Sequence, residues 1–232
     1  MRRPASAGAL RGKTVLITGG ASGLGATVAE QLGEDDACLV IADRAFDVAL
    51  DRTTALAENG IDALPIELDV GDEADVRRSI AEVRKRFGRL DVVVNNVEIG
   101  IRASIAELAS DEWERVVRTN LTGPFLIAKH AASALAANDA KPRGHLVNIA
   151  SVQCQGEWPN PAACHVTKWG LLGLSQALRA ELEPRGIKVT ALMSAGMRTP
   201  YLLEASPGID PAALQDSAHV ARALRAMLAV AG

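Results

Sequence analysis

The sequence predicts an α/β protein with a single doubly wound parallel sheet of about six strands and helices on both faces. Strand-sized apolar runs alternate with helix-sized amphipathic runs along the chain, which is the order of strand–helix–strand units. The apolar runs show no two-residue alternation, as expected for strands buried on both faces. With 232 residues, of which 48% are hydrophobic, the chain is long enough to form one large domain.

Six strands are expected where β-branched and aliphatic residues run together between turn-forming residues. The first run, KTVLIT, ends in a pair of glycines, and the later runs ACLVIAD, ALPIELDV, DVVVNN, HLVNIA and IKVTALM have similar lengths. They occupy residues 13–18, 37–43, 63–70, 91–96, 145–150 and 187–193.

Helices are expected between the strands, where apolar residues recur at helical spacing. The segment 72–87 has an acidic first turn and a basic last turn, which suits the helix dipole. Gly123 and Pro124 are expected to break one helix, and Pro184 is expected to end another. The helical ranges are 23–33, 46–58, 72–87, 111 to the break at 123–124, that break to 137, 162–183 and 217–229.

The remaining segments and the charge limit the classes of protein. Residues 1–11 are basic but lack an apolar stretch, so we expect a flexible tail before a single domain at 12–232. Residues 198–215 contain three prolines and are expected to form a loop with at most a short helix. The net charge is −3 and no basic run is interleaved with aromatic residues, which argues against a nucleic-acid-binding protein.

Cysteine usage and hydropathy favour a protein of the cytoplasm. The three cysteines, Cys38, Cys154 and Cys164, lack the spacing of a disulfide framework, which favours free thiols in a reducing compartment. No apolar run approaches the roughly 20 residues that a membrane-spanning helix needs. We therefore expect no nucleic acid, membrane or metal.

A glycine-rich turn, TGGASGLG, follows the first strand and opens a helix. Gly19 permits a tight turn, Gly23 lets the backbone approach a pyrophosphate, and Gly25 lets helix and strand pack closely. Three glycines alone also suit an ordinary strand–helix turn. However, Asp43 ends the second strand, 18 residues after Gly25, where a carboxylate can bind ribose hydroxyls and repels a 2′-phosphate. The pattern favours NAD, and Arg44, which can accept a 2′-phosphate, keeps NADP as the alternative.

With its ordered motifs the chain resembles the short-chain dehydrogenase/reductase family over residues 12–200. The motifs are TGGASGLG, IADR, LDV, DVVVNN, RTNLTGPF, VNIAS, the segment around Lys168, and AGMRTP. The resemblance implies a Rossmann-type fold, with Asp69 and Val70 near the adenine, Asn95 near the adenosine ribose, and Thr199 near the nicotinamide amide. The implied cofactor site comprises Gly19, Ser22, Gly23, Leu24, Gly25, Asp43, Arg44, Asp69, Val70, Asn95, Lys168 and Thr199.

The family transfers hydride between nicotinamide and a carbonyl or hydroxyl carbon of a small-molecule substrate, and the resemblance carries three of its four catalytic positions onto this chain. Asn120 matches the asparagine that anchors a water, Ser151 the serine that polarises the substrate oxygen, and Lys168 the lysine that holds the nicotinamide ribose. The fourth position belongs to a tyrosine acid, and this chain has Cys164 there. The spacing to Ser151 and to Lys168 matches the family, so we interpret the cysteine as a substitution.

Several roles for Cys164 remain open. A thiol, with a pKa of about 8.5 that a nearby lysine lowers, can carry a proton. The sulfur does not reach as far as the oxygen of a tyrosine phenol, so a water would have to bridge the thiol and the substrate. Alternatively, Ser151 acts as the acid through such a water. Cys164 is otherwise a small buried residue or a nucleophile. His165 follows Cys164 on the helix, so its side chain points roughly 100° away from the acid position and is a poor substitute for the tyrosine. Cys154, Cys164 and His165 lack the spacing of a zinc site.

Other positions also depart from the family's pattern. Glu98 stands where the family has a glycine, and its bulk and negative charge are expected to weaken NAD binding. Ala195 stands where proline is usual. No strand follows the helix at 217–229, so the family's last strand, which helps to build a subunit interface, is expected to be absent. A four-helix interface through 111–137 and 162–183 is expected to support a homodimer or homotetramer.

Two interpretations of function follow. The first is an NAD(H)-dependent oxidoreductase with Cys164 in the acid position, which the presence of Asn120, Ser151 and Lys168 favours. The second is a relative that keeps the fold without hydride transfer, which Cys164 and Glu98 favour. Such a relative is a non-redox catalyst of the cyclase or dehydratase type, or a pseudoenzyme that serves as a partner subunit.

Overall fold

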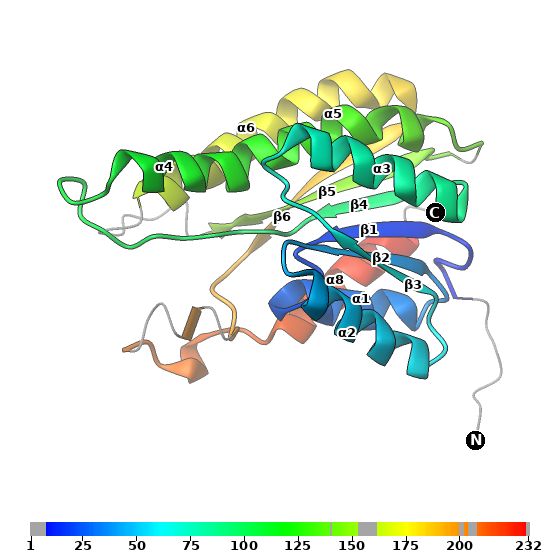
Figure 1. Ribbon diagram of the computed structural model, residues 1–232, viewed down its shortest axis with the longest axis horizontal. Coiled ribbons are helices and arrows are strands. Elements are labelled where there is room, and N and C mark those ends of the chain that lie inside the picture. Colours follow the sequence, from blue (N-terminus) through cyan, green and yellow to red (C-terminus); the bar gives the residue numbers. More distant parts are fainter. Residues whose placement is uncertain (1–7, 140, 153–161, 200–201, 204–207, 231–232) are drawn as a thin grey trace.

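The computed structural model describes residues 8–139, 141–152, 162–199, 202–203 and 208–230 (Figure 1). Expectations for Cys154 and for the tail before residue 8 lie outside these residues. The described part forms a six-stranded sheet in the order β3-β2-β1-β4-β5-β6, and each neighbouring pair is parallel. The predicted doubly wound parallel sheet is confirmed.

The strands lie close to the predicted ranges. The third was expected to continue to Val70 but ends at Glu67, because the chain turns once the amide of Leu68 has bonded to the Asp43 carbonyl at 3.0 Å. The Asp69 carboxylate then accepts a bond from the Gly71 amide, which fixes that turn. The strands are β1 (Thr14–Thr18), β2 (Cys38–Asp43), β3 (Ala63–Glu67), β4 (Val92–Asn95), β5 (Gly144–Ser151) and β6 (Ile187–Ser194).

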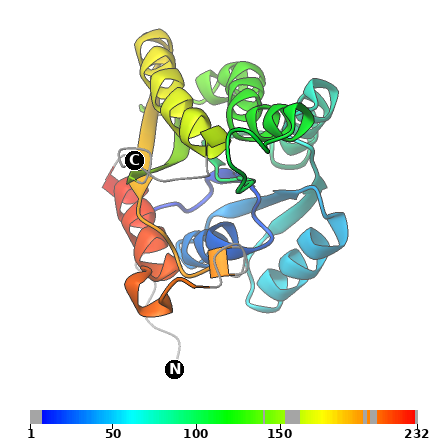
Figure 2. The ribbon, with the colours of Figure 1, turned by 90° about the vertical axis from the view of Figure 1, so that its left-hand side faces the viewer.

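Helices cover both faces of the sheet in two layers (Figures 1 and 2). One layer contains α1 (Gly23–Gly33), α2 (Phe46–Glu58) and α8 (Ser217–Val230). The other contains α3 (Glu73–Phe87), α5 (Gly123–Ala136) and α6 (Ala162–Leu182). The shorter helical segments are α4 (Ser110–Val117) and the turns η1 (Arg118–Thr122), η3 (Glu183–Arg185) and η4 (Pro211–Ala213). None of the helices in the described ranges combines the length and hydropathy of a membrane span.

The predicted break at Gly123 and Pro124 is wrong. The chain stays helical from α4 into α5 through the π-helical turn η1, which lies directly before Gly123. Pro124 lies in the first turn of α5, where a residue without an amide hydrogen is tolerated. Gly123 lets this helix approach β3's end closely, since a Cβ there would lie 2.7 Å from a methyl of Val70.

The segment expected to be a flexible tail is ordered in its last residues. Residues 8–11 form a turn in which the Arg11 amide bonds to the Gly8 carbonyl at 3.0 Å. Leu10 is buried, and it packs in the apolar core between the sheet and the layer of α1 and α8. These residues are ordered because the apolar side chain of Leu10 covers the edge of that core.

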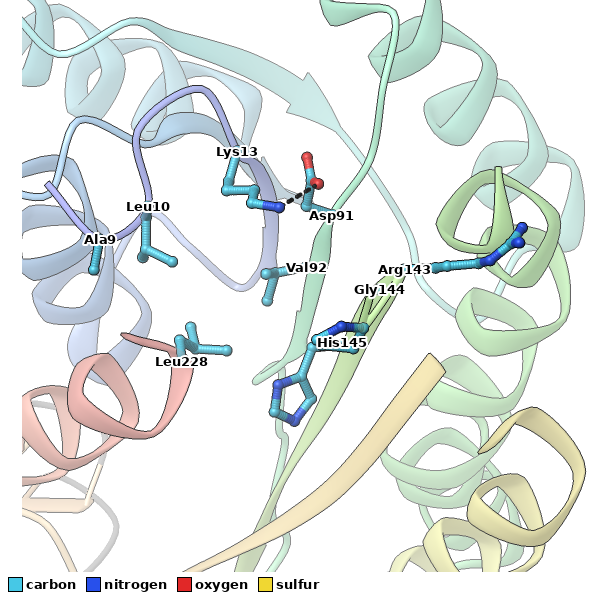
Figure 3. A pocket seen from close by; sticks show the side chains of 10 residues that line it. Ala9, Leu10, Lys13, Asp91, Val92, Arg143, Gly144, His145 and Leu228 are labelled. Carbon is cyan, nitrogen blue, oxygen red and sulfur yellow. Dashed lines mark ion pairs between the residues drawn. The ribbon is translucent and has the colours of Figure 1, made fainter. Parts of the chain in front are cut away.

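The carboxyl ends of the strands border a crevice, and the amino ends border a small pocket. The strand order reverses between β1 and β4, so the connections that follow these two strands run in opposite directions. In an open α/β sheet this arrangement forms the usual ligand-binding crevice at the carboxyl ends of the strands. At the amino ends, a pocket with a cavity volume of about 40 Å³ lies between Lys13, Asp91, His145 and Leu228 (Figure 3). That space suits a few water molecules.

Candidate functional site

The glycine-rich turn occupies the crevice at the end of β1. Gly19 and Gly23 have φ values of 62° and 52°, which favour glycine. A Cβ on Gly25 would lie 2.1 Å from the Gly19 carbonyl oxygen, so only glycine lets α1 start this close to the strand. Ser22, the N-cap of α1, makes no side-chain capping bond, and Leu24 is buried. The amides at the start of α1 therefore suit an anion such as a pyrophosphate.

The end of β4 is fastened to this turn by Asn96, which the sequence reading did not assign to the site. Its side-chain amide donates to the carbonyls of Thr18 at 3.0 Å and Gly19 at 3.1 Å, and its backbone amide donates to the Thr18 hydroxyl at 3.1 Å. The paired asparagines after an apolar strand were the signal for this tie. It fixes the distance between the two strands that border the crevice.

Asp43 and Arg44 lie where the sequence placed them, at the end of β2 beside β1. The Asp43 carboxylate is half-buried, and one of its oxygens accepts a bond from the Ala45 amide at 3.1 Å, which orients the group. Arg44 is exposed. An oriented carboxylate at this place fits a pair of ribose hydroxyls.

The residues implied to surround the adenine are held by contacts within the chain. Asp69 accepts from the Gly71 amide at 2.9 Å and pairs with Arg118 at 3.3 Å. Val70 is buried against Gly123. These contacts join the segment after β3 to η1 and to the start of α5.

Asn95 and Thr199 differ in how they meet the crevice. Asn95 is buried, and its side-chain amide donates to Asn148 at 2.8 Å, so its main chain is the part that can face a ribose. Asn148 in turn donates to the hydroxyl of Ser175 in α6 at 2.8 Å. Thr199 lies beside the glycine turn, because its methyl is 3.7 Å from the position of a Cβ on Gly23.

Asn120 lies in the π-helical turn and fastens the segment after β4. Its side-chain oxygen accepts from the Ile99 amide at 2.9 Å, and its nitrogen donates to the Ile99 carbonyl at 2.8 Å. The same nitrogen lies 3.4 Å from the hydroxyl of Thr167 in α6. The amide of Asn120 is thus used to position Ile99.

Cys164, near the start of α6, meets the same carbonyl. Its sulfur lies 3.7 Å from the Ile99 oxygen. Burial raises the pKa of the Cys164 thiol, and the carboxylate of Glu98 raises it further. The Ile101 amide and the Lys168 ammonium act in the opposite direction, but the pKa stays raised. Cys164 is therefore a protonated thiol at neutral pH.

Lys168 lies one turn later on α6 and is 7% exposed. Its ammonium donates to the Ile149 carbonyl at 3.0 Å and forms an ion pair with Glu98 at 2.9 Å. The sequence reading noted the unusual position of Glu98 but missed this pair. Ser151 is half-buried at the carboxyl end of β5, in register with Ser194 of β6.

The structure thus brings Asn120, Cys164, Lys168 and Glu98 together around the segment that follows β4. Among the described residues, Cys38 and Cys164 are free thiols. Within the described ranges, no three His, Cys, Asp or Glu side chains are grouped as metal ligands.

Comparison with known proteins gives relatives along most of the chain. A family model described as short chain dehydrogenase matches residues 13–209. An uncharacterized oxidoreductase of Thermotoga maritima is 32% identical over 190 residues, which are 82% of this chain and 73% of that protein. Trans-4-hydroxycyclohexanecarboxylate dehydrogenase of Sinomonas cyclohexanicum is 35% identical over 194 residues, which are 81% of this chain and 73% of the relative.

A solved structure agrees with this assignment. The crystal structure of a short-chain type dehydrogenase/reductase from Mycobacterium marinum superposes with a TM-score of 0.87 at 26% identity. The match covers 95% of this chain and 90% of the other. The chain therefore belongs to the short-chain dehydrogenase/reductase family of oxidoreductases.

Proposed function

We propose that the chain is an NAD(H)-dependent oxidoreductase that interconverts a secondary alcohol and a ketone, with Cys164 in the position of the family's tyrosine. The observation that carries this proposal is the convergence on one segment. Asn120 and Cys164 both reach the carbonyl of Ile99, and Lys168 lies one helical turn from Cys164. Ser151 at the end of β5 completes the set that the family uses.

The crevice suits a dinucleotide at its adenosine side. The amides at the start of α1 can hold a pyrophosphate, and Asp43 can accept bonds from ribose hydroxyls. The Asp43 carboxylate repels a 2′-phosphate, which supports NAD over NADP. A bound nicotinamide supplies the hydride donor or acceptor.

The chain's own residues supply the proton and the orientation. The Cys164 thiol is protonated at neutral pH because burial and Glu98 raise its pKa, so it holds a proton for the substrate oxygen. A water bridges the distance that a phenol would span. Ser151 donates a hydrogen bond to the substrate oxygen, and Asn120 keeps Ile99 in place.

The relative from Sinomonas names a first substrate, trans-4-hydroxycyclohexanecarboxylate. The experiment follows NADH consumption with the ketone that corresponds to this compound and with a panel of cyclic ketones, because the protonated thiol supplies the proton that carbonyl reduction needs. We expect turnover with NADH in preference to NADPH, and a loss of about 100-fold or more in Cys164→Ala. No turnover in the unmodified chain, together with a gain in Cys164→Tyr, would contradict the thiol's role.

A second candidate function rests on the ion pair of Glu98 and Lys168. In this candidate the protein binds a nucleotide but transfers no hydride, and it serves as a non-redox catalyst or as a partner subunit. The ion pair favours this candidate because Lys168 already has a charged partner within the chain. Absence of turnover in both the unmodified chain and Cys164→Tyr, with nucleotide binding retained, would select this candidate.

We also propose that the protein forms a homodimer, or a tetramer built from it, through α5 and α6. Exposed apolar side chains on these helices support the proposal, namely Phe125 on α5 and Val166 and Trp169 on α6. Sedimentation velocity of the full chain tests it. Trp169→Asp should shift the sedimentation coefficient to that of a monomer, while a monomer in the unmodified chain would rule out the interface.

A further inference from the structure

We infer that Glu98 sets the ligand specificity of the crevice, so that it prefers adenine nucleotides that end at the diphosphate over complete NAD(H). The inference rests on the nucleotide site of the proposed function. It concerns which part of the dinucleotide that site accepts.

The two sides of the crevice differ in how their polar groups are used. At the start of α1, the capping serine makes no side-chain bond to the helix amides, and no acidic residue lies in the first turn. A diphosphate can therefore replace water there without displacing a protein group. Around Lys168, the ammonium already holds a carboxylate of the same chain at 2.9 Å.

A count of hydrogen-bond donors shows what a ribose would meet at Lys168. The ammonium has three N–H donors and uses one on the Ile149 carbonyl, while the Glu98 carboxylate lies 2.9 Å away as its counter-ion. A ribose that takes the place of Glu98 would leave its carboxylate without a partner beside a ligand that already carries two negative phosphates. A ribose that shares the site must compete with this carboxylate for the ammonium.

Glu98 cannot easily withdraw, because residues close to it on both sides are anchored. Asn96 bonds to the carbonyls of Thr18 and Gly19, and Ile99 is held by both its amide and its carbonyl through Asn120. The Lys168 side chain is 9% exposed, so opening the pair leaves a buried cation without its counter-ion. The free-energy cost of opening this ion pair weakens the binding of a ligand that reaches Lys168. ADP ends at the diphosphate, so its binding does not carry this cost.

Calorimetric titration of the full chain with ADP, ADP-ribose and NAD⁺ tests the inference. The unmodified chain should bind ADP at least as tightly as NAD⁺. Glu98→Gly should tighten binding of ADP-ribose and NAD⁺ by about tenfold to hundredfold, the effect of one hydrogen bond to a charged group, and leave ADP unchanged. Glu98→Gln, which keeps the side chain's shape, serves as a second variant if glycine impairs folding.

Two controls separate the pair from general charge effects. Glu107→Gln removes a carboxylate from the same segment, one that accepts from the Ser104 hydroxyl at 2.6 Å, and should change none of the affinities. Lys168→Ala should weaken NAD⁺ binding strongly in the Glu98→Gly background and only weakly in the unmodified chain. This non-additivity reports directly that Glu98 and a ribose compete for one ammonium.

The outcomes distinguish the inference from the function on which it rests. If the unmodified chain binds NAD⁺ about tenfold more tightly than ADP, or Glu98→Gly leaves their ratio unchanged, the inference is overturned and the oxidoreductase proposal stands. If neither nucleotide binds to any variant, the nucleotide site itself is overturned, and the inference falls with it.

Discussion

The two ends of the sheet each bury a charged group, but they surround it with different partners. At the amino end, Asp91 is 4% exposed and accepts two bonds from Arg89 at 2.7 Å and one from the Thr14 amide at 2.9 Å, with Lys13 at 3.5 Å. These partners lie at or just before the starts of β1 and β4, in the framework of the fold. Figure 3 shows Asp91 with Lys13.

At the carboxyl end, Lys168 is also buried, but its charged partner, Glu98, is 38% exposed. The partner comes from the segment that follows β4, at the crevice. The comparison teaches that burial alone does not separate a structural charge from a functional one. The charge at the amino end is neutralised by the framework, whereas the charge at the carboxyl end is neutralised by a partly exposed group at the crevice, with which a ligand must compete.

The largest expected effect tests the amino end. Asp91→Ala leaves the Thr14 amide and the Arg89 guanidinium without their acceptor, so we expect the free energy of unfolding to fall by about 3 kcal/mol in urea titrations. Asp62→Ala removes an exposed carboxylate that pairs with Arg86, and it should cost less than about 1 kcal/mol. Equal losses in the two variants would break the comparison.

The next effect concerns pH at the same end. Burial, with the nearby Lys188 ammonium, lowers the pKa of His145 to about 4. The unfolded chain therefore takes up this proton first as the pH falls below about 6.5, and acid destabilises the fold. From pH 7 to pH 5 the free energy of unfolding should fall by about 2 kcal/mol from this group.

His145→Gln provides the matched measurement. The imidazole bonds to the Thr190 hydroxyl at 2.8 Å and leaves its Nδ1 atom without a partner. Glutamine can keep a bond to Thr190 but does not titrate, so the difference in stability between pH 7 and pH 5 should shrink. An unchanged difference would assign the acid sensitivity to other groups.

A smaller loss of stability is expected at the carboxyl end. Glu98→Gln keeps an acceptor for Lys168 but removes its counter-ion, and it should lower the free energy of unfolding by about 1 kcal/mol. Thermal and urea unfolding measure this loss. A loss as large as that of Asp91→Ala would make Glu98 a framework residue and would contradict its assignment to ligand discrimination.

The same substitution should also change the Cys164 thiol. With Glu98 neutral, one of the causes that raise the pKa of Cys164 is gone, so the thiolate fraction at pH 8 rises and alkylation by iodoacetamide becomes faster. The measurement uses a chain with Cys38→Ser and Cys154→Ser, in which Cys164 is the remaining cysteine. Glu107→Gln is the control, and an alkylation rate that falls would contradict the expected direction.

Much of the fold could be predicted from the sequence because it depends on local patterns. The six apolar runs and the glycine turn identify the strands and the crevice, and the spacing around Lys168 predicts its place on α6. The predictions that were wrong concern segments in which tertiary contacts override the local sequence pattern. Pro124 was expected to break a helix that continues through a π turn, and Leu10 was expected in a tail but is buried.

The site was predictable in its members but not in their pairing. Asn120, Cys164 and Lys168 were identified from the resemblance to the family, and the structure brings them together. The ion pair between Glu98 and Lys168 joins residues 70 positions apart, and its formation depends on how Asn96 and Asn120 fix the segment after β4. No local pattern encodes that geometry.

The π-helical turn at 118–122 has a consequence for insertions and deletions in this part of the chain. Each residue of a helix advances the side chains by about 100°, so this wider turn sets the phase between α4 and α5. Deleting one residue before Asn120 would rotate its amide away from Ile99 or force α4 to rotate instead. Length in this stretch is therefore constrained as tightly as residue identity, and a library that varies loop lengths should leave it unchanged.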